Sequence, residues 1–275
     1  MTARRSLRLR PEIAATVPDT AMVMAAGLGK RMRPLTDTRP KPLVELAGKP
    51  LIDHVLDRLR TAGVSKLVVN VHYLPDQLEA HLATRADDFA ITISDERALL
   101  LETGGGLVQA APMIDCDPFL VVNSDNFWID GPSDGLKLLA SGWDDDKMDA
   151  LLLLVRTTQV ENEVGRGDFL MDGLLLLVPQ ARAGNHRGQG DFHMDRFGRL
   201  SRRARSRVAP YVFTGIQMVS KRLLADAPSG AFSTNILWDR AIEAGRCFGL
   251  VHQGLWFDVG TPRSITDTEA ALINE

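Results

Sequence analysis

A glycine-rich segment with three cations carries the clearest chemical signal in the sequence. Residues 25–36 read AAGLGKRMRPLT, and in them two glycines are followed by Lys30, Arg31 and Arg33. Glycine lets backbone N–H groups approach an anion closely, and an arginine guanidinium can donate two hydrogen bonds to phosphate oxygens. A lysine adds a point charge. The segment is therefore predicted to bind a polyphosphate.

Two familiar phosphate-binding motifs do not match this segment. A P-loop requires G-x-x-x-x-G-K-[ST], but the glycines here are two residues apart and Arg31 follows Lys30. The dinucleotide-binding fingerprint requires a third glycine at position 32, where this chain has Met32. Taken alone, the segment leaves a basic surface turn as the alternative.

Two aspartates are candidate metal ligands. Asp125 follows the apolar run 119–123, and Asp258 follows Trp256 and Phe257. A carboxylate next to apolar residues is costly to bury without a cation, and Mg²⁺ usually takes one or two protein carboxylates together with substrate phosphates. One such aspartate would be interpreted as a turn or cap residue. The pairing of two favours a metal site.

Short β-rich runs that alternate with helical patterns must position these groups. Strands are predicted over 21–26, 66–72, 89–94, 119–123, 211–219 and 247–252, and helices over 50–63, 75–83, from 105 onward, 234–245 and 263–275. Such a pattern is typical of an α/β fold with a Rossmann-like, mixed but mostly parallel sheet flanked by helices. The carboxyl ends of its strands would hold the polar clusters 27–36, 102–106 and 123–126.

The middle of the chain contains a tandem duplication. Residues 148–170 and 171–193 are identical at 12 of 23 aligned positions, and each copy carries an LLLLV run and a GDF motif. Both LLLLV runs are predicted to be ordered strands. The position of one buried strand in a sheet cannot hold two strands. We therefore expect the additional LLLLV strand to contribute to a homodimer contact.

Composition restricts the class of protein. The net charge of −3 argues against a general nucleic-acid binder, and no apolar run approaches the length of about 20 residues that spans a bilayer. Two distant cysteines give no disulfide framework, so a cytoplasmic location is expected. Residues 1–20 are expected to form a flexible basic leader, and residues 21–275 a single domain. The basic run 199–207 is interpreted as a solvated hairpin and loop.

The continuation of the glycine-rich segment resembles a known family. Residues 25–59, AAGLGKRMRPLTDTRPKPLVELAGKPLIDHVLDRL, are similar to the signature of the sugar-1-phosphate nucleotidyltransferases, which make nucleotide-diphosphate sugars from a nucleoside triphosphate and a sugar-1-phosphate. Within that family the chain is most similar to the bacterial N-acetylmuramic acid-1-phosphate uridylyltransferases of peptidoglycan recycling, followed by the mannose-1-phosphate guanylyltransferases. The resemblance implies an enzyme that uses Mg²⁺, while the net charge and the lack of a long apolar run lead us to expect no nucleic-acid or membrane partner. A non-catalytic sugar-nucleotide sensor of the same fold is the alternative.

The resemblance also implies roles for individual residues, matched motif by motif. The nucleotide-binding residues would be Ala25, Ala26, Gly27, Gly29, Arg31, Glu102, Thr103, Gly104 and Gly105. The catalytic residues would be Arg31, Lys41 and Asp125, and the metal ligands Asp125 and Asp258. The sugar-binding residues would be Asn123, Gly190, Asp191, Thr214 and Gly215.

This sequence departs from the family pattern at three points. Ser124 stands where a glycine is usual, and the Glu-Lys pair that many relatives carry on the sugar side is not found. The GDF motif occurs twice, at 167–169 and 190–192, and only one copy can occupy the sugar-side position. The second is favoured because it runs directly into the downstream hairpin.

Overall fold

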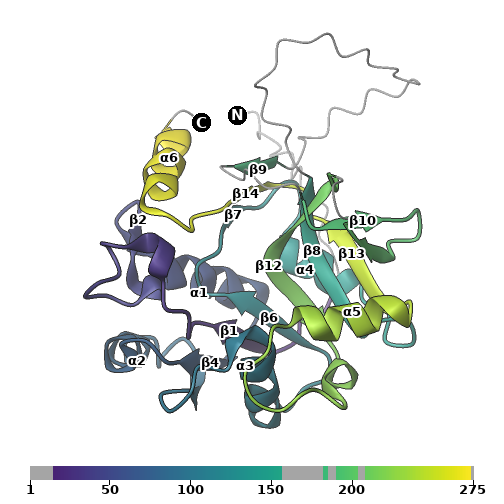
Figure 1. The fold of residues 1–275 in the computed structure, drawn as a ribbon. Helices are drawn as coiled ribbons and strands as arrows, with labels where there is room; N and C mark the ends of the chain where they lie inside the picture. Colours follow the sequence, from purple (N-terminus) through teal and green to yellow (C-terminus); the bar gives the residue numbers. More distant parts are fainter. Residues whose placement is uncertain (1–14, 157–181, 185–189, 204–207, 274–275) are drawn as a thin grey trace, which may run out of the picture.

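The computed structural model describes residues 15–156, 182–184, 190–203 and 208–273 (Figure 1). Its main feature is a nine-stranded sheet. One half consists of four parallel strands in the order β5-β4-β1-β6, formed by Ala90–Asp95, Lys66–Val71, Thr20–Met24 and Phe119–Asn123. These are the strands that the Val- and Leu-rich runs predict, with ends that differ by one or two residues.

The second half of the sheet introduces the antiparallel pairings. Strand β12 (Tyr211–Val219) runs antiparallel to both β6 and β8 (Ala150–Arg156), and β13 (Cys247–Val251) pairs with β8 in parallel. A hairpin of β10 (Phe192–Met194) and β11 (Leu200–Arg202) attaches to the start of β12. The predicted mixed, mostly parallel sheet is therefore confirmed.

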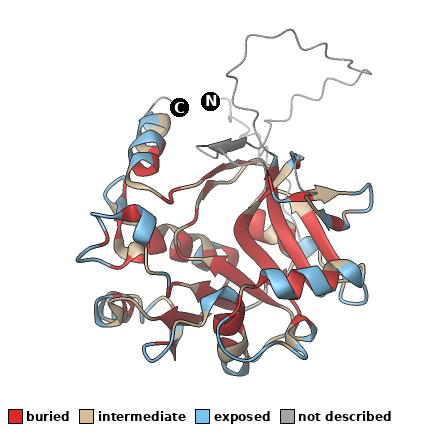
Figure 2. Cartoon of the chain, in the orientation of Figure 1, coloured by how far each residue is buried: buried red, intermediate tan, exposed pale blue. Residues whose placement is uncertain are grey.

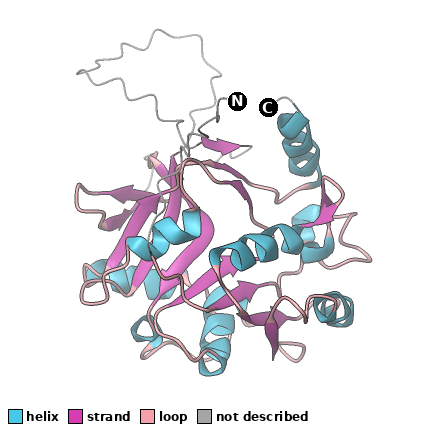
Figure 3. Cartoon of the chain, turned by 180° about the vertical axis from the view of Figure 1, so that it is seen from behind, coloured by secondary structure: helices cyan, strands magenta, loops and turns pink. Residues whose placement is uncertain are grey.

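Helices cover both faces of this sheet, as Figure 3 shows from behind. One face packs against α1 (Leu51–Ala62), α2 (Pro75–Ala83) and α4 (Gly135–Ser141). The other packs against α3 (Glu102–Ala110) and α5 (Asn235–Glu243). Neighbouring residues of β1 show why the strands are apolar throughout, because Met22 points to one core and Val23 to the other. Figure 2 shows the sheet as the buried centre of the molecule.

A third, smaller core lies beyond the carboxyl ends of the strands. It joins Met32, from the glycine-rich segment, to Val259 and to Ile265 of the last helix α6 (Pro262–Ile273). Small strands frame it: β2 (Glu45–Leu46) pairs with β3 (Lys49–Pro50), and β14 (Leu255–Phe257) lies between β7 (Phe127–Ile129) and β9 (Arg182–Gly184). Short 3₁₀ turns complete the connections: η1 (Lys30–Met32), η2 (Lys41–Leu43), η3 (Ala111–Met113) and η4 (Lys221–Leu224).

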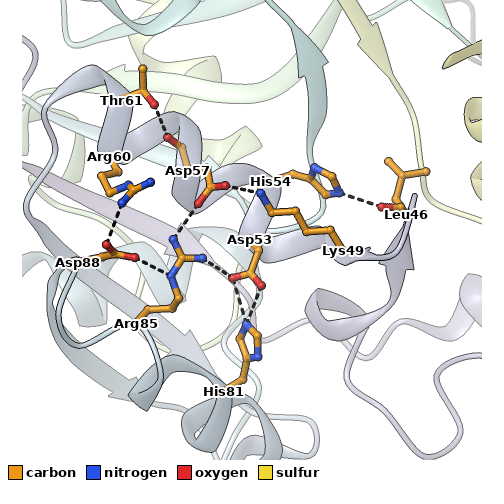
Figure 4. Close-up of polar contacts among 10 residues, drawn as sticks. All are labelled: Leu46, Lys49, Asp53, His54, Asp57, Arg60, Thr61, His81, Arg85 and Asp88. Carbon is orange, nitrogen blue, oxygen red and sulfur yellow. Dashed lines mark hydrogen bonds and ion pairs between the residues drawn. The ribbon is translucent and has the colours of Figure 1, made fainter.

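A polar network fastens α2 and the turn that follows it to α1 (Figure 4). The Arg85 guanidinium donates to the carboxylates of Asp53, Asp57 and Asp88 at 2.7–2.9 Å. Burial raises the pKa of Asp57, but hydrogen bonds from Lys49 and Arg85 outweigh it and leave that pKa below its usual value. The network therefore locks two helices together on the face of the sheet away from α3.

Several sequence-based expectations fall partly outside the described residues. The first LLLLV run is β8, a buried strand of the sheet, whereas the second run, 174–178, lies in the segment that is not described. The same holds for residues 1–14 of the expected leader and for 204–207 of the basic run. Among the residues the structure describes, no helix has the length and hydropathy needed to cross a bilayer.

Candidate active site

The glycine-rich segment turns sharply where β1 ends. Gly29 has φ +61°, and a Cβ there would lie 2.9 Å from Thr36 Cγ2, so the turn requires glycine. The Thr36 hydroxyl donates to the Gly29 carbonyl at 2.8 Å. Gly27 faces open space, since no atom lies within 4 Å of its Cβ position. The turn directs Arg31 toward the cleft while Met32 is anchored in the small core.

Two buried polar residues that the sequence analysis missed hold this segment in place. Asn70 accepts a hydrogen bond from the Ala25 backbone N–H at 2.6 Å and donates to Glu96 at 2.7 Å. The other oxygen of the Glu96 carboxylate accepts from the Leu101 backbone N–H at 3.0 Å. The chain of bonds therefore joins the glycine-rich segment to the residue before α3. An asparagine within the apolar run 66–71 is the only signal in the sequence.

The first cavity, of about 420 Å³, opens at the carboxyl ends of β1 and β6. Of the expected nucleotide-binding residues, Ala25, Ala26, Gly27, Glu102 and Thr103 line it. Lys41, Asn123 and Asp125 also contribute to its wall. The structure thus brings the glycine-rich segment, the start of α3 and the end of β6 around one space, as the sequence predicts for this edge of the sheet.

Gly104 and Gly105 lie behind that wall rather than in it. Their backbone N–H groups donate to the Phe232 carbonyl at 2.8 and 3.2 Å. A Cβ at position 104 would lie 2.4 Å from the Phe232 ring, and one at 105 would lie 2.3 Å from the Gly230 carbonyl. These glycines allow α3 to pack closely against the 230–232 loop, which in turn fixes where Thr103 stands.

The second cavity, of about 210 Å³, brings together the expected phosphate-binding arginine and the two expected metal ligands. Arg31, Asp125 and Asp258 all line it. Asp258 accepts a hydrogen bond from the Gly260 backbone N–H at 3.1 Å. A Cβ on Gly260 would lie 2.9 Å from the Asp258 carboxylate and 3.1 Å from the Arg31 guanidinium, so both groups flank this glycine.

The other arginine of the segment points elsewhere. Arg33 forms an exposed ion pair with Asp37 at 3.3 Å and lines neither of these cavities. The two arginines of one basic cluster therefore have different surroundings, and Arg31 is the one that reaches the site.

The donor set of the second cavity fits a divalent cation. Three aspartates line it, Asp125, Asp191 and Asp258, and Lys41 forms an ion pair with Asp125. No group of three or more histidine, cysteine, aspartate or glutamate side chains suited to a metal occurs in the described part of the chain. Of these aspartates, Asp125 and Asp258 are the expected metal ligands, and two carboxylates with room for phosphate oxygens are typical of a Mg²⁺ site rather than of a zinc site.

Four of the five expected sugar-side residues line the same cavity, namely Asn123, Asp191, Thr214 and Gly215, whereas Gly190 is not among its lining residues. Gly190 has φ +73°, and a Cβ there would lie 2.1 Å from the Ala209 carbonyl, so only glycine fits. Asp191 accepts a hydrogen bond from the Phe213 backbone N–H at 2.9 Å. The register of β12 shifts between Phe213 and Gln217, and Gly215 (φ +82°), which lies within this irregularity, lines the cavity.

Asn123 and Thr214 complete this side in different ways. The Asn123 amide lies over Gly215, 2.6 Å from its Cβ position, and lines both cavities. The Thr214 side chain is buried and its hydroxyl donates to the Leu153 carbonyl at 2.8 Å. Thr214 therefore shapes the bulge in β12 and borders the cavity without offering its hydroxyl proton.

The two copies of the duplicated unit supply different parts of the structure. The apolar strand in the sheet comes from the first copy, as β8. Asp191, which lines the cavity, and Gly190 before it come from the second copy, while the first GDF motif, 167–169, lies outside the described residues.

Comparisons with known proteins identify the class of this site. A family model described as nucleotidyl transferase matches residues 20–165. The chain therefore belongs to the nucleotidyl transferase family, and it is an enzyme of that type, as the glycine-rich signature implied.

Individual relatives refine this assignment. An N-acetylmuramate alpha-1-phosphate uridylyltransferase of Caulobacter vibrioides is 41% identical over 93% of this chain and 97% of its own. A mannose-1-phosphate guanyltransferase of Gibberella zeae is 41% identical over 38% of this chain and 29% of its own. The inositol-1-phosphate CTP transferase structure from T. maritima has a TM-score of 0.68 at 16% identity, covering 95% and 98% of the two chains, and it confirms the fold.

Proposed function

We propose that this enzyme transfers a uridylyl group from UTP to N-acetylmuramic acid 1-phosphate, giving the UDP-sugar and pyrophosphate. The observation that carries the proposal is the adjoining pair of cavities, in which Arg31 and Lys41 stand with Asp125 and Asp258. The near full-length similarity to an N-acetylmuramate alpha-1-phosphate uridylyltransferase supports the choice of substrates. The first cavity would bind the nucleotide and the second the reacting phosphates and the sugar.

The proposed reaction is an in-line displacement at phosphorus. An oxygen of the sugar phosphate attacks the α-phosphorus, the bond from that phosphorus to the bridging oxygen breaks, and pyrophosphate leaves. Because the nucleophile is already an anion, no general base and no covalent enzyme intermediate are needed. The work of the protein is to bring two anions together and to stabilise developing charge, for which Arg31 and Lys41 are placed.

Asp125 and Asp258 would hold Mg²⁺ together with the substrate phosphates. A bound Mg²⁺ neutralises phosphate charge in such reactions. Lys41 forms an ion pair with Asp125, so this carboxylate already has a positive charge beside it. Because the Glu-Lys pair that many relatives carry is not found in this sequence, Lys41, the metal or another residue would have to neutralise the phosphate on the sugar side.

A substrate matrix tests this proposal. Pyrophosphate release would be measured for five nucleoside triphosphates against the 1-phosphates of N-acetylmuramic acid, N-acetylglucosamine, glucose and mannose. We expect UTP with N-acetylmuramic acid 1-phosphate to give the highest kcat/KM. A maximum at GTP with mannose 1-phosphate would favour the guanylyltransferase alternative, and no release with any pair would favour a sugar-nucleotide sensor.

The remaining parts of the proposal concern the cellular setting and the assembly. We place the enzyme in the cytoplasm, in the recycling of peptidoglycan, with no nucleic-acid partner. Filter binding of DNA at low and high salt tests the last point. The second LLLLV run is proposed to contribute to a homodimer, and a strictly monomeric mass by light scattering at high concentration would contradict it.

A further inference from the structure

A third cavity, of about 270 Å³, opens beside the proposed nucleotide cavity. It shares Met24, Thr103, Asn123 and Ser233 with that cavity, and Asn123 and Phe213 with the second cavity, which Asp125 and Asp258 line. This side chamber therefore lies at the point where the two proposed substrates meet.

The chamber is suited to an uncharged group. Its apolar wall consists of Leu107, Val121, Phe213 and Trp238. The rings of Phe213 and Trp238 pack edge to face, with their centroids 4.8 Å apart. Among the described residues that line it, none is Asp, Glu, Lys or Arg. A phosphate or carboxylate would find no cation in this wall, so the charged parts of the substrates belong in the neighbouring cavities.

Gln217 gives the chamber one fixed hydrogen-bond donor. Its side chain lines the chamber and the residue is only 4% exposed. The Trp238 indole N–H donates to Gln217 Oε1 at 2.9 Å, and since an indole nitrogen can only donate, the amide orientation is set.

The other end of the Gln217 amide is left without a protein partner. Within the described part of the chain, Nε2 donates to no acceptor. It is also not one of the fully enclosed polar atoms that lack a partner, so the Nε2 atom keeps some contact with open space. Its open side is therefore the chamber that Gln217 lines. A nearly buried donor without a partner is unfavourable until a ligand supplies an acceptor.

We propose that the side chamber binds the acetamido group of an N-acetyl sugar, with Gln217 as a specificity-determining residue. The acetamido carbonyl would accept from Gln217 Nε2, and its methyl group would pack against Phe213 and Trp238. A sugar with only a hydroxyl at this position has no apolar group that could pack against this wall. The inference rests on the proposed function and specifies which class of sugar the site selects.

Calorimetry with a matched pair of ligands tests the inference without requiring turnover. UDP-N-acetylglucosamine and UDP-glucose differ only in the acetamido group. We expect the wild-type protein to bind the acetylated ligand about tenfold more tightly, a ratio typical of one satisfied hydrogen bond with methyl burial. Gln217→Leu should reduce the ratio to about threefold, because only the burial of the methyl group against Phe213 and Trp238 remains, while the affinity for UDP stays unchanged.

Two further variants separate the donor from the wall. Trp238→Phe keeps an aromatic wall but frees the Gln217 amide to rotate, so the ratio should fall only in part. Gln109→Leu serves as the matched control, because this glutamine of α3 donates to Ser94 and Asp95 away from the chamber. The control should keep the full wild-type ratio.

The outcomes distinguish this inference from the proposed function. An unchanged ratio in Gln217→Leu, or no preference in the wild type, overturns the inference even if pyrophosphate is released from UTP and N-acetylmuramic acid 1-phosphate. Binding of UDP but of neither UDP-sugar overturns it as well. A ratio that falls in Gln217→Leu, without pyrophosphate release from any pair, supports the chamber and contradicts the proposed function.

Discussion

Lys41 and Asp125 form an ion pair, although 84 positions separate them in the sequence. The pair links the 3₁₀ turn η2 to the end of β6, and so it closes one corner of the cleft. The Lys41 side chain is 14% exposed and that of Asp125 is 29% exposed, so the pair is partly shielded from water. Opposite charges in such surroundings interact more strongly than on an open surface, and removing one partner leaves the other uncompensated.

Asp125→Asn should therefore lower turnover by about two to four orders of magnitude, since it removes a proposed metal ligand and leaves Lys41 without its partner. Pyrophosphate release at saturating substrate would measure the loss, and circular dichroism would show an intact fold. The matched control is Asp144→Asn, whose carboxylate pairs with Lys147 on the surface. Near-normal kcat in Asp125→Asn would remove the assigned role.

The two arginines of the glycine-rich segment should differ sharply in effect. Arg31 lines the same cavity as Asp125 and Asp258, whereas Arg33 pairs with Asp37 in solvent. We expect Arg31→Ala to reduce kcat/KM for the nucleoside triphosphate by at least about 100-fold. Arg33→Ala should change it by less than about threefold. Equal losses in both variants would mean that the segment acts only through its overall positive charge.

Gly260 should be sensitive to a single methyl group. A Cβ at this position would lie 2.9 Å from the Asp258 carboxylate and 3.1 Å from the Arg31 guanidinium. Gly260→Ala would push these two groups apart, so we expect a large fall in kcat and a higher requirement for Mg²⁺ in the titration of activity. Gly142→Ala is the control, because its nearest neighbour is 3.5 Å away. Equal activity in the two variants would contradict this arrangement.

The sequence predicted the sheet and the groups that surround the cleft, but not the contacts that hold them. The apolar runs predicted strands such as β1 and β6 because residues buried on both faces of a sheet must be apolar throughout. The glycine-rich signature predicted that Arg31 would face the site, and Arg31 lines the second cavity. Asn70 and Glu96 were missed because one polar residue in a strand has no periodicity, and its partner is set by tertiary packing. The burial of Gly104 and Gly105 against the 230–232 loop was missed for the same reason.

Glu96 and Asn70 are expected to act as positioning residues for the nucleotide. Both oxygens of the Glu96 carboxylate accept hydrogen bonds, from Asn70 and from the Leu101 backbone. Glu96→Gln turns one acceptor into a donor, which should cost about 1–3 kcal/mol of unfolding free energy in urea titrations. We also expect KM for the nucleoside triphosphate to rise more than kcat falls, because the two walls of the cavity lose their link. A loss confined to stability would restrict this network to a structural role.

The buried side chain of His252 is expected to make the unfolding free energy depend on pH. Burial lowers the pKa of this histidine below its usual 6.5, and the charge of Asp130 only partly opposes that effect. At pH values below 6.5, the unfolded chain takes up a proton that the folded chain accepts only at lower pH. The contribution of His252 to stability is therefore complete above pH 6.5 and is lost as pH falls through the lowered pKa. Urea titrations from pH 8 to pH 5 should show this decline.

His252→Gln should flatten that decline, because glutamine does not titrate. It replaces a ring whose Nε2 lies 3.2 Å from the Ile129 carbonyl, so the variant is expected to be less stable at pH 8 as well. The comparison therefore uses the slope of the unfolding free energy between pH 6.5 and pH 5 rather than its absolute value. Parallel curves for the two proteins would show that other groups cause the acid sensitivity. A flatter curve for the variant would assign the difference between the two slopes to the buried imidazole of His252, which lies between β13 and β14.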